Sequence, residues 1–152
     1  MNSLLRLTAI ALGFAFAVHA NAQQVPAGVV MFDISKVQWE KSPTGENAKI
    51  VGDASKPGPY VFLTKPRAAP GPQNKPHTHP DTRTYTVISG TWYIGFGDKF
   101  DESKLIGLKP GSFYTEPAGV SHFVVIKDEG VIVQISGTGP SRLIPVGETA
   151  KK

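Results

Sequence analysis

Glycine and proline interrupt this 152-residue chain every few residues, and the apolar runs that they leave are short. The sequence contains sixteen glycines and thirteen prolines. Within the runs, apolar and polar side chains tend to alternate, which is typical of strands rather than helices. We expect roughly nine or ten strands within residues 29–34, 37–40, 48–51, 60–64, 83–89, 91–96, 105–108, 112–116, 122–126 and 131–136. Short strands at this spacing, with no convincing helix, predict an all-β sandwich or barrel of the jelly-roll kind.

One segment departs from this pattern because it is dense in proline. Seven prolines lie between residues 57 and 80. Each of them removes a backbone donor from any strand ladder, so proline is rare in the middle of a sheet. We therefore expect most of this segment to form an ordered loop or the edge of a sheet.

The first 22 residues have the pattern of a secretion signal. A short basic stretch, residues 1–6, precedes an apolar run of 12 residues, Leu7–Val18, which is too short to span a bilayer as a helix. His19-Ala20-Asn21-Ala22 then provides an A-x-A ending for cleavage. We expect an exported protein, periplasmic or secreted, whose mature form is one domain over residues 23–152 and does not insert in a membrane.

Charge and cysteine content exclude several classes of function. Without residues 1–22, fifteen basic and twelve acidic side chains remain, and the lysines are scattered rather than clustered. A chain without a basic stripe is not expected to bind nucleic acid. The sequence has no cysteine, so disulfides, thiolate metal sites and thiol nucleophiles are all excluded.

The three histidines of the predicted mature chain suggest a metal site. His77 and His79 are two residues apart, and on an extended strand both side chains would project from the same face. His122 follows a Pro-Ala-Gly turn at the start of another apolar run. Three imidazoles that meet inside a barrel could bind one divalent transition metal. Iron, manganese, nickel, copper and zinc all remain open, since ligand type does not choose among them.

The segment around the first two histidines resembles the first signature motif of the cupin superfamily, a family of small β-barrels. That motif reads G-x5-H-x-H-x3,4-E-x6-G. Gly71, His77 and His79 match it, and Gly90 lies at the position of the closing glycine. The stretch that corresponds to the motif is residues 71–90.

The segment around the third histidine resembles the second cupin motif, G-x5-P-x-G-x2-H-x3-N. Gly111, Pro117, Gly119 and His122 match it, whereas Ile126 replaces the common asparagine. This stretch covers residues 111–126, at a distance from the first that is typical of small cupins. The resemblance implies a single cupin-type β-barrel over residues 23–152, similar to the type-2 cupins, with His77, His79 and His122 as metal ligands.

The sequence differs from the cupin pattern at one metal ligand. Arg83 occupies the position where the family normally has a glutamate, and a guanidinium cannot ligate a cation. Three outcomes are open. Arg83 could bind an anionic substrate beside a three-histidine metal, an arrangement compatible with the known three-histidine cupin dioxygenases. It could instead pair with Asp81, Asp101 or Glu116, or it could repel cations and leave a metal-free binding pocket.

Three further residues are candidates for the site. Glu116 could act as a substitute carboxylate or general base, or form a surface ion pair. Tyr85 and Gln134 could contact a substrate, together with Arg83, although Gln134 could equally point outward. Arg83 and Glu116 are the candidates for a catalytic role.

Two classes of function fit these residues. The first is a metal-dependent enzyme of the dioxygenase, isomerase or lyase type that acts on a small organic acid through oxygenase-like or carbonyl-polarising chemistry. The second is a non-catalytic small-molecule binder, with or without metal. Many small cupins dimerise by strand exchange, so the resemblance also implies a homodimer in which residues 29–40 form the interface.

Overall fold

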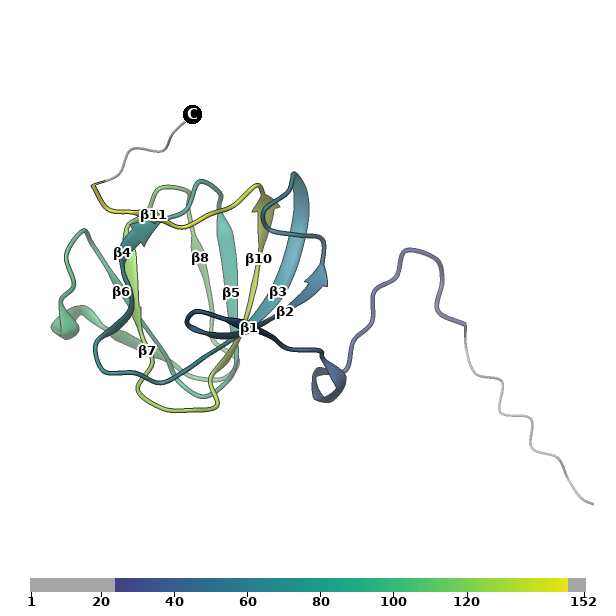
Figure 1. Ribbon diagram of the computed structural model, residues 1–152, viewed down its shortest axis with the longest axis horizontal. Helices are drawn as coiled ribbons and strands as arrows, with labels where there is room; N and C mark the ends of the chain where they lie inside the picture. Colours follow the sequence, from purple (N-terminus) through teal and green to yellow (C-terminus); the bar gives the residue numbers. More distant parts are fainter. Residues whose placement is uncertain (1–23, 148–152) are drawn as a thin grey trace, which may run out of the picture.

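The computed structural model describes residues 24–147, and these residues form two antiparallel β-sheets (Figure 1). The signal predicted for residues 1–22 lies outside the described residues. The six-stranded sheet has the order β1 (Glu40–Ser42), β2 (Gly45–Val51), β3 (Gly58–Pro66), β10 (Ile132–Gly139), β5 (Arg83–Ser89) and β8 (Phe113–Glu116). The five-stranded sheet has the order β11 (Ile144–Pro145), β4 (Pro72–Thr78), β9 (His122–Val125), β6 (Trp92–Phe96) and β7 (Ile106–Leu108).

The helical content is confined to two short 3-10 turns, η1 (Ile34–Lys36) and η2 (Glu102–Lys104), within residues 24–147. The all-β prediction is therefore confirmed. No helix in that range has the length and apolar character needed to cross a membrane.

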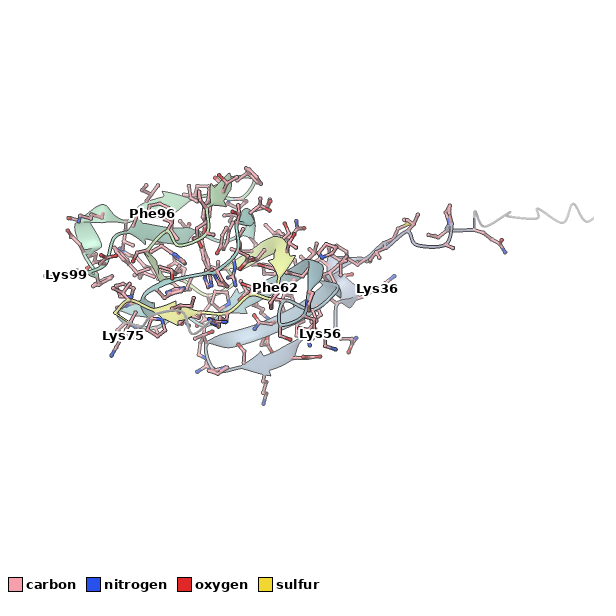
Figure 2. All side chains as sticks on the ribbon, turned by 90° about the horizontal axis from the view of Figure 1, so that it is seen from above. Lys36, Lys56, Phe62, Lys75, Phe96 and Lys99 are labelled. Carbon is pink, nitrogen blue, oxygen red and sulfur yellow. The ribbon has the colours of Figure 1, made fainter. Side chains whose placement is uncertain are left out.

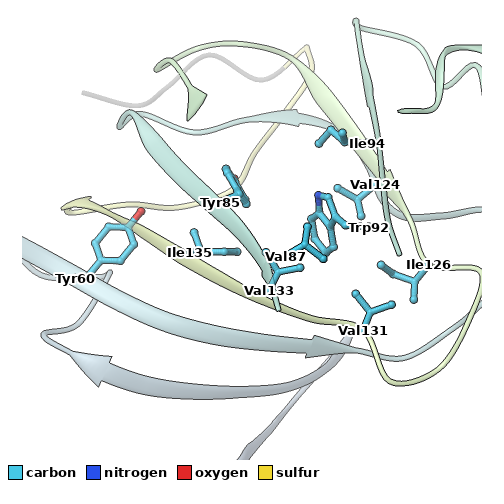
Figure 3. Close-up of a cluster of buried hydrophobic side chains, with 10 residues drawn as sticks. All are labelled: Tyr60, Tyr85, Val87, Trp92, Ile94, Val124, Ile126, Val131, Val133 and Ile135. Atoms are coloured by element: carbon cyan, nitrogen blue, oxygen red, sulfur yellow. The ribbon is translucent and has the colours of Figure 1, made fainter. Parts of the chain in front are cut away.

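Alternation along the strands places the apolar core between the two sheets. On β5, Arg83, Tyr85 and Val87 are buried, whereas Thr84 and Thr86 between them are only partly buried. Figure 3 shows how side chains from both sheets meet in this core, which comprises Tyr60, Tyr85, Val87, Trp92, Ile94, Val124, Ile126, Val131, Val133 and Ile135. The core adjoins the candidate site, because two core residues, Tyr85 and Trp92, also line the cavity described below.

A glycine allows β6 and β9 to pack closely. Gly95 is the register partner of Phe123, which is fully buried. A Cβ atom at Gly95 would lie only 2.3 Å from the Phe123 ring. The absence of a side chain at this position lets the ring lie against the backbone of β6.

The strand expected at residues 60–64 is present within β3, but the expectation of a loop or sheet edge for the proline-dense segment was wrong for β4 and for the ends of β3. β3 lies between β2 and β10, and β4 is paired on both sides, with β9 and with β11. The β4–β9 pairing is interrupted by register shifts between Pro72 and Asn74 and between Asn74 and His77. These irregularities accommodate Pro72 and Pro76 in the strand, because a bulge leaves backbone donors unpaired.

The strand expected at residues 29–34 is also absent. This stretch is irregular up to η1, and Val25, Val29, Val30, Met31, Phe32 and Ile34 are all exposed. Figures 1 and 2 show that this N-terminal arm, residues 24–36, extends away from the barrel. A strand needs a neighbour to pair with, and the arm has none within residues 24–147.

Candidate metal centre

Three histidines from two neighbouring strands come together inside the barrel. His77 on β4 and His122 on β9 are direct register partners, and His79 follows the end of β4. Their exposed fractions are 3%, 2% and 6% for His77, His122 and His79. Ring centroids lie 4.2 Å apart for His77 and His122, 4.9 Å for His77 and His79, and 5.2 Å for His79 and His122.

Backbone carbonyls fix the orientation of all three rings. Nδ1 lies 2.8 Å from the Lys75 carbonyl in His77, 2.8 Å from the Arg142 carbonyl in His79, and 3.2 Å from the Val120 carbonyl in His122. A carbonyl only accepts, so each Nδ1 carries the proton and donates it. Each Nε2 therefore carries the lone pair of its neutral ring, with which it can accept a hydrogen bond or bind a metal.

The histidines are held in the neutral form. Burial lowers the pKa of His77, and it lowers that of His122 to about 4, with His77 adding to the effect. Burial and then the charge of Arg83 lower the pKa of His79 to about 3. Metal binding requires neutral imidazole, so no proton has to be removed near pH 7.

These donors fit a divalent transition metal. One ring nitrogen from each histidine lies within 4.8 Å of the others. Nitrogens bound to one metal at about 2.0–2.1 Å lie roughly 3–3.5 Å from each other, so the most distant nitrogens would have to approach by up to about 1.5 Å. Neutral imidazole suits zinc, copper, iron and nickel, and three such ligands leave coordination positions for a small molecule.

Arg83 directly contacts one of the three Nε2 lone pairs. Its Nη1 lies 3.0 Å from Nε2 of His79, and because guanidinium can only donate, the histidine accepts. Nη2 donates to the Ser141 hydroxyl, and Nε lies 3.6 Å from the Asp81 carboxylate. Arg83 is buried, with an exposed fraction of 8%.

Asp81 is the carboxylate that forms an ion pair with Arg83. It accepts hydrogen bonds from the Ser141 hydroxyl and, at 2.6 Å, from the Tyr60 hydroxyl. Asp101 is instead the N-cap of η2, in the loop between β6 and β7. Of the three pairings considered from sequence, the structure contains the one with Asp81.

Glu116 is buried, so the surface ion pair that was one of its two alternatives is not formed. Its exposed fraction is 1%, and it faces Arg83 across the β5–β8 pairing. One carboxylate oxygen accepts from the Tyr85 hydroxyl at 3.3 Å, and the other lies 3.3 Å from Nδ1 of His122. Burial raises the pKa of Glu116 to about 7, although Arg83 acts in the opposite direction. The Glu116 carboxylate therefore contacts the Nδ1 side of the His122 ring, and Nε2 lies on the opposite side.

A cavity of about 410 Å³ adjoins the histidines. It is lined by Ser42, Pro43, Thr44, Asn47, Phe62, Thr64, Pro66, Gln73, Asn74, His77, His79, Arg83, Tyr85, Trp92, His122, Val124, Ile135 and Leu143. Tyr85 thus lies where a substrate could contact it, stacked at 4.4 Å on Tyr114. Gln134 does not line the cavity. Its neighbour Ile135 does, and successive strand residues point to opposite faces.

Sequence reasoning missed several residues of this site. Tyr60 and Ser141 hold Asp81 and Arg83 from positions 21 to 60 residues away in the chain. Asn47 comes from a segment that showed no local motif, and Gln73 and Asn74 occupy unspecified positions between Gly71 and His77 of the first motif. Their positions depend on strand pairing, which short-range patterns do not reveal.

Two sheets that enclose three inward-facing histidines, with a cavity beside them, define a cupin-type β-barrel. The family model for the ChrR cupin-like domain matches residues 27–141. The chain belongs to this family, and the predicted membership of the cupin superfamily is confirmed.

Relatives with related sequences are germin-like proteins of plants. Germin-like protein subfamily 1 member 7 of Arabidopsis thaliana is 37% identical over 83 residues, which cover 52% of this chain and 36% of that protein. Germin-like protein 8-2 of Oryza sativa subsp. japonica is 30% identical over 96 residues, covering 59% and 43%. The matched regions thus span less than half of these relatives.

Solved structures share the fold at low sequence identity. The polyketide cyclase RemF from Streptomyces resistomycificus has a TM-score of 0.60 and 14% identity, over 80% of this chain and 87% of that chain. KdgF from Halomonas sp. has a TM-score of 0.54 and 15% identity, over 74% and 94%.

Proposed function

We propose that the protein binds one divalent transition metal through His77, His79 and His122, and a small organic anion through Arg83. The observation that carries this proposal is the contact between Arg83 and Nε2 of His79. The guanidinium reaches the position where a metal would bind, so an anion held by Arg83 would lie beside that metal. Arginine binds carboxylates well because its fork of donors can form two parallel hydrogen bonds.

The chemistry that we propose is that of a metal-dependent enzyme acting on the bound acid. A metal at this position would supply Lewis acidity or the redox capacity of an oxygenase. Arg83 would hold the acid, and the aromatic floor formed by Tyr85 and Trp92 would limit access of water from the core side. Dioxygenase, isomerase and lyase reactions remain candidates, because the cupin fold itself does not determine the reaction.

The alternative is a non-catalytic binder that captures the acid, with or without metal. It is favoured by the contact between Arg83 and His79, in which the guanidinium donates to the Nε2 atom that a metal would need. Substrate turnover or dioxygen consumption that is lost in His79→Ala supports the enzyme. Binding without turnover that survives this substitution supports the binder.

The anion proposal can be tested by titrating metal-loaded protein with hexanoate and with hexanol, its uncharged counterpart. We expect hexanoate to bind at least about tenfold more tightly than hexanol, since a hydrogen bond to a charged group contributes about 1.5–3 kcal/mol. Arg83→Met should reduce this difference by at least about tenfold, which is the share that the arginine contributes. Arg67→Met, which removes an exposed arginine outside the cavity, should leave the difference unchanged. An undiminished difference in Arg83→Met would contradict the proposal.

Export is also proposed, on the pattern of residues 1–22. Expression of the full chain in a Gram-negative host should release a periplasmic or secreted protein that begins at Gln23. Mass spectrometry of the intact product measures this directly. A product in the cytosol that retains residues 1–22 would contradict export.

We further propose that the N-terminal arm mediates a homodimer. Six apolar side chains between Val25 and Ile34 are exposed on it. A second copy of the chain could cover them and provide the strand partner that this arm lacks.

A further inference from the structure

The cavity has an uncharged polar region at a distance from the histidines. This region is formed by the β1–β2 hairpin, the end of β3 and the beginning of β4, and it comprises Ser42, Thr44, Asn47, Thr64, Gln73 and Asn74. Gln73 and His77 are four residues apart on β4, and four residues of a strand span at most about 13 Å. The cavity can therefore contact a molecule at two separate places.

Two buried polar atoms in this region have no hydrogen-bond partner within residues 24–147. They are the Ser42 hydroxyl oxygen and Oε1 of Gln73. An unpaired buried polar atom is costly, so atoms of this kind call for an explanation. Because both residues line the cavity, a ligand in the cavity could provide the missing partners.

The free atom of Gln73 is an acceptor. Nε2 of Gln73 donates to the Thr44 carbonyl at 2.8 Å. A flipped amide would place Oε1 against that carbonyl, and two acceptors would then face each other. The orientation is thus fixed, and Oε1 requires a donor from the ligand.

The donor that fits is a neutral hydroxyl. Among the residues that line the cavity, Arg83 has the one permanently charged side chain, so no carboxylate is present to balance an ammonium group. A hydroxyl can donate to Gln73 and can either donate to Ser42 or accept from it.

We infer that Ser42 and Gln73 form a hydroxyl-binding subsite, and that the ligand is a hydroxylated carboxylic acid. Its carboxylate would lie at Arg83 and its hydroxyl groups near β1 and β4. The carboxylate part of this inference rests on the proposed function, whereas the subsite itself rests on the two unpaired atoms. A cavity of about 410 Å³ accommodates an acid of this size.

The test compares gluconate with hexanoate, two six-carbon carboxylates that differ in their hydroxyl groups. Calorimetric titration of the metal-loaded protein should give at least about fivefold tighter binding of gluconate. Ser42→Ala and Gln73→Met should each reduce that preference by about fivefold, while hexanoate affinity and metal content stay unchanged. Gln134→Met is the matched control, because this glutamine lies outside the cavity, and it should leave the preference intact.

Equal binding of gluconate and hexanoate would overturn the subsite, and so would a preference that survives in both variants. If the anion proposal fails, a different set of results is expected. Sorbitol, the uncharged counterpart of gluconate, distinguishes the two cases. Binding of sorbitol that is lost in Ser42→Ala and Gln73→Met, without binding of either acid, would support the subsite and contradict the role of Arg83. Absence of binding by all three compounds would overturn the inference.

Discussion

Replacing Arg83 with methionine should strengthen metal binding, because arginine and metal compete for the same nitrogen. Nη1 of Arg83 lies 3.0 Å from Nε2 of His79, and a metal must take over that lone pair. A hydrogen bond with a charged donor contributes about 1.5–3 kcal/mol. Its removal therefore predicts a dissociation constant at least about tenfold lower in Arg83→Met.

Charge repulsion acts in the same direction. A guanidinium about 5 Å from a divalent cation would repel it by roughly 6–7 kcal/mol at an effective dielectric constant of 20. The carboxylate of Asp81, 3.6 Å from Nε of Arg83, offsets much of this repulsion. The tenfold figure is thus the lower bound, and Arg83→Glu, which adds a carboxylate ligand, should bind metal more tightly still.

Competition with a fluorescent chelator for zinc and for manganese measures these affinities. Arg83→Met leaves Asp81 without its cation, and breaking a buried pair costs about 3–5 kcal/mol of stability. The double variant Asp81→Asn/Arg83→Met removes both charges, so it leaves no unpaired buried charge that could prevent folding. Arg67→Met is the control for the loss of an arginine. Metal affinity that is unchanged or weaker in both Arg83→Met and the double variant would refute the competition.

Three further predictions concern acid stability, packing and assembly. Because two of the buried histidines have their pKa lowered to about 3 and about 4, the unfolded chain binds more protons below pH 6.5, and the metal-free protein should lose stability between pH 7 and pH 5. Glu116 acts in the opposite direction, because its raised pKa of about 7 lets the folded chain bind one proton that the unfolded chain does not bind in this range. Each proton by which the unfolded chain exceeds the folded chain lowers the free energy of unfolding by at most about 1.4 kcal/mol per pH unit. Stability that rises on acidification in urea titrations would contradict this prediction. Gly95→Ala should cost about 1–3 kcal/mol in the same assay, since the new Cβ would meet the Phe123 ring at 2.3 Å, and an unchanged midpoint would argue against that packing. Deletion of residues 24–33 should convert a dimer to a monomer in sedimentation equilibrium, and a dimer that persists would exclude the arm as the interface.

Local alternation was enough to predict most of the fold. β5 and β10 were predicted because β-branched and aromatic residues alternate along them. β4 was not, because its prolines argue against a strand and its pairing with β9 depends on residues about 45 positions later in the chain. The arm shows the opposite error, since its apolar residues predicted a strand although no strand within residues 24–147 pairs with it.

The histidine cluster could be predicted from spacing, whereas the surroundings of Arg83 could not. An H-x-H pair and a histidine after a tight turn identify side chains that face one interior. The partners of Arg83 are set by tertiary contacts, since Ser141 is 58 residues away along the chain. Whether Glu116 is buried or at the surface could not be decided from the sequence, because its burial follows from the β5–β8 pairing.

The three-histidine metal centre is tested most directly by the metal content of the mature protein, purified without chelator and compared with the variant His77→Ala/His79→Ala. We expect one equivalent of a transition metal in the wild-type protein and its loss in the variant. Elemental analysis by mass spectrometry provides both numbers. Wild-type protein that holds no metal, even after reconstitution with iron, manganese, nickel, copper and zinc in turn, would contradict the metal centre.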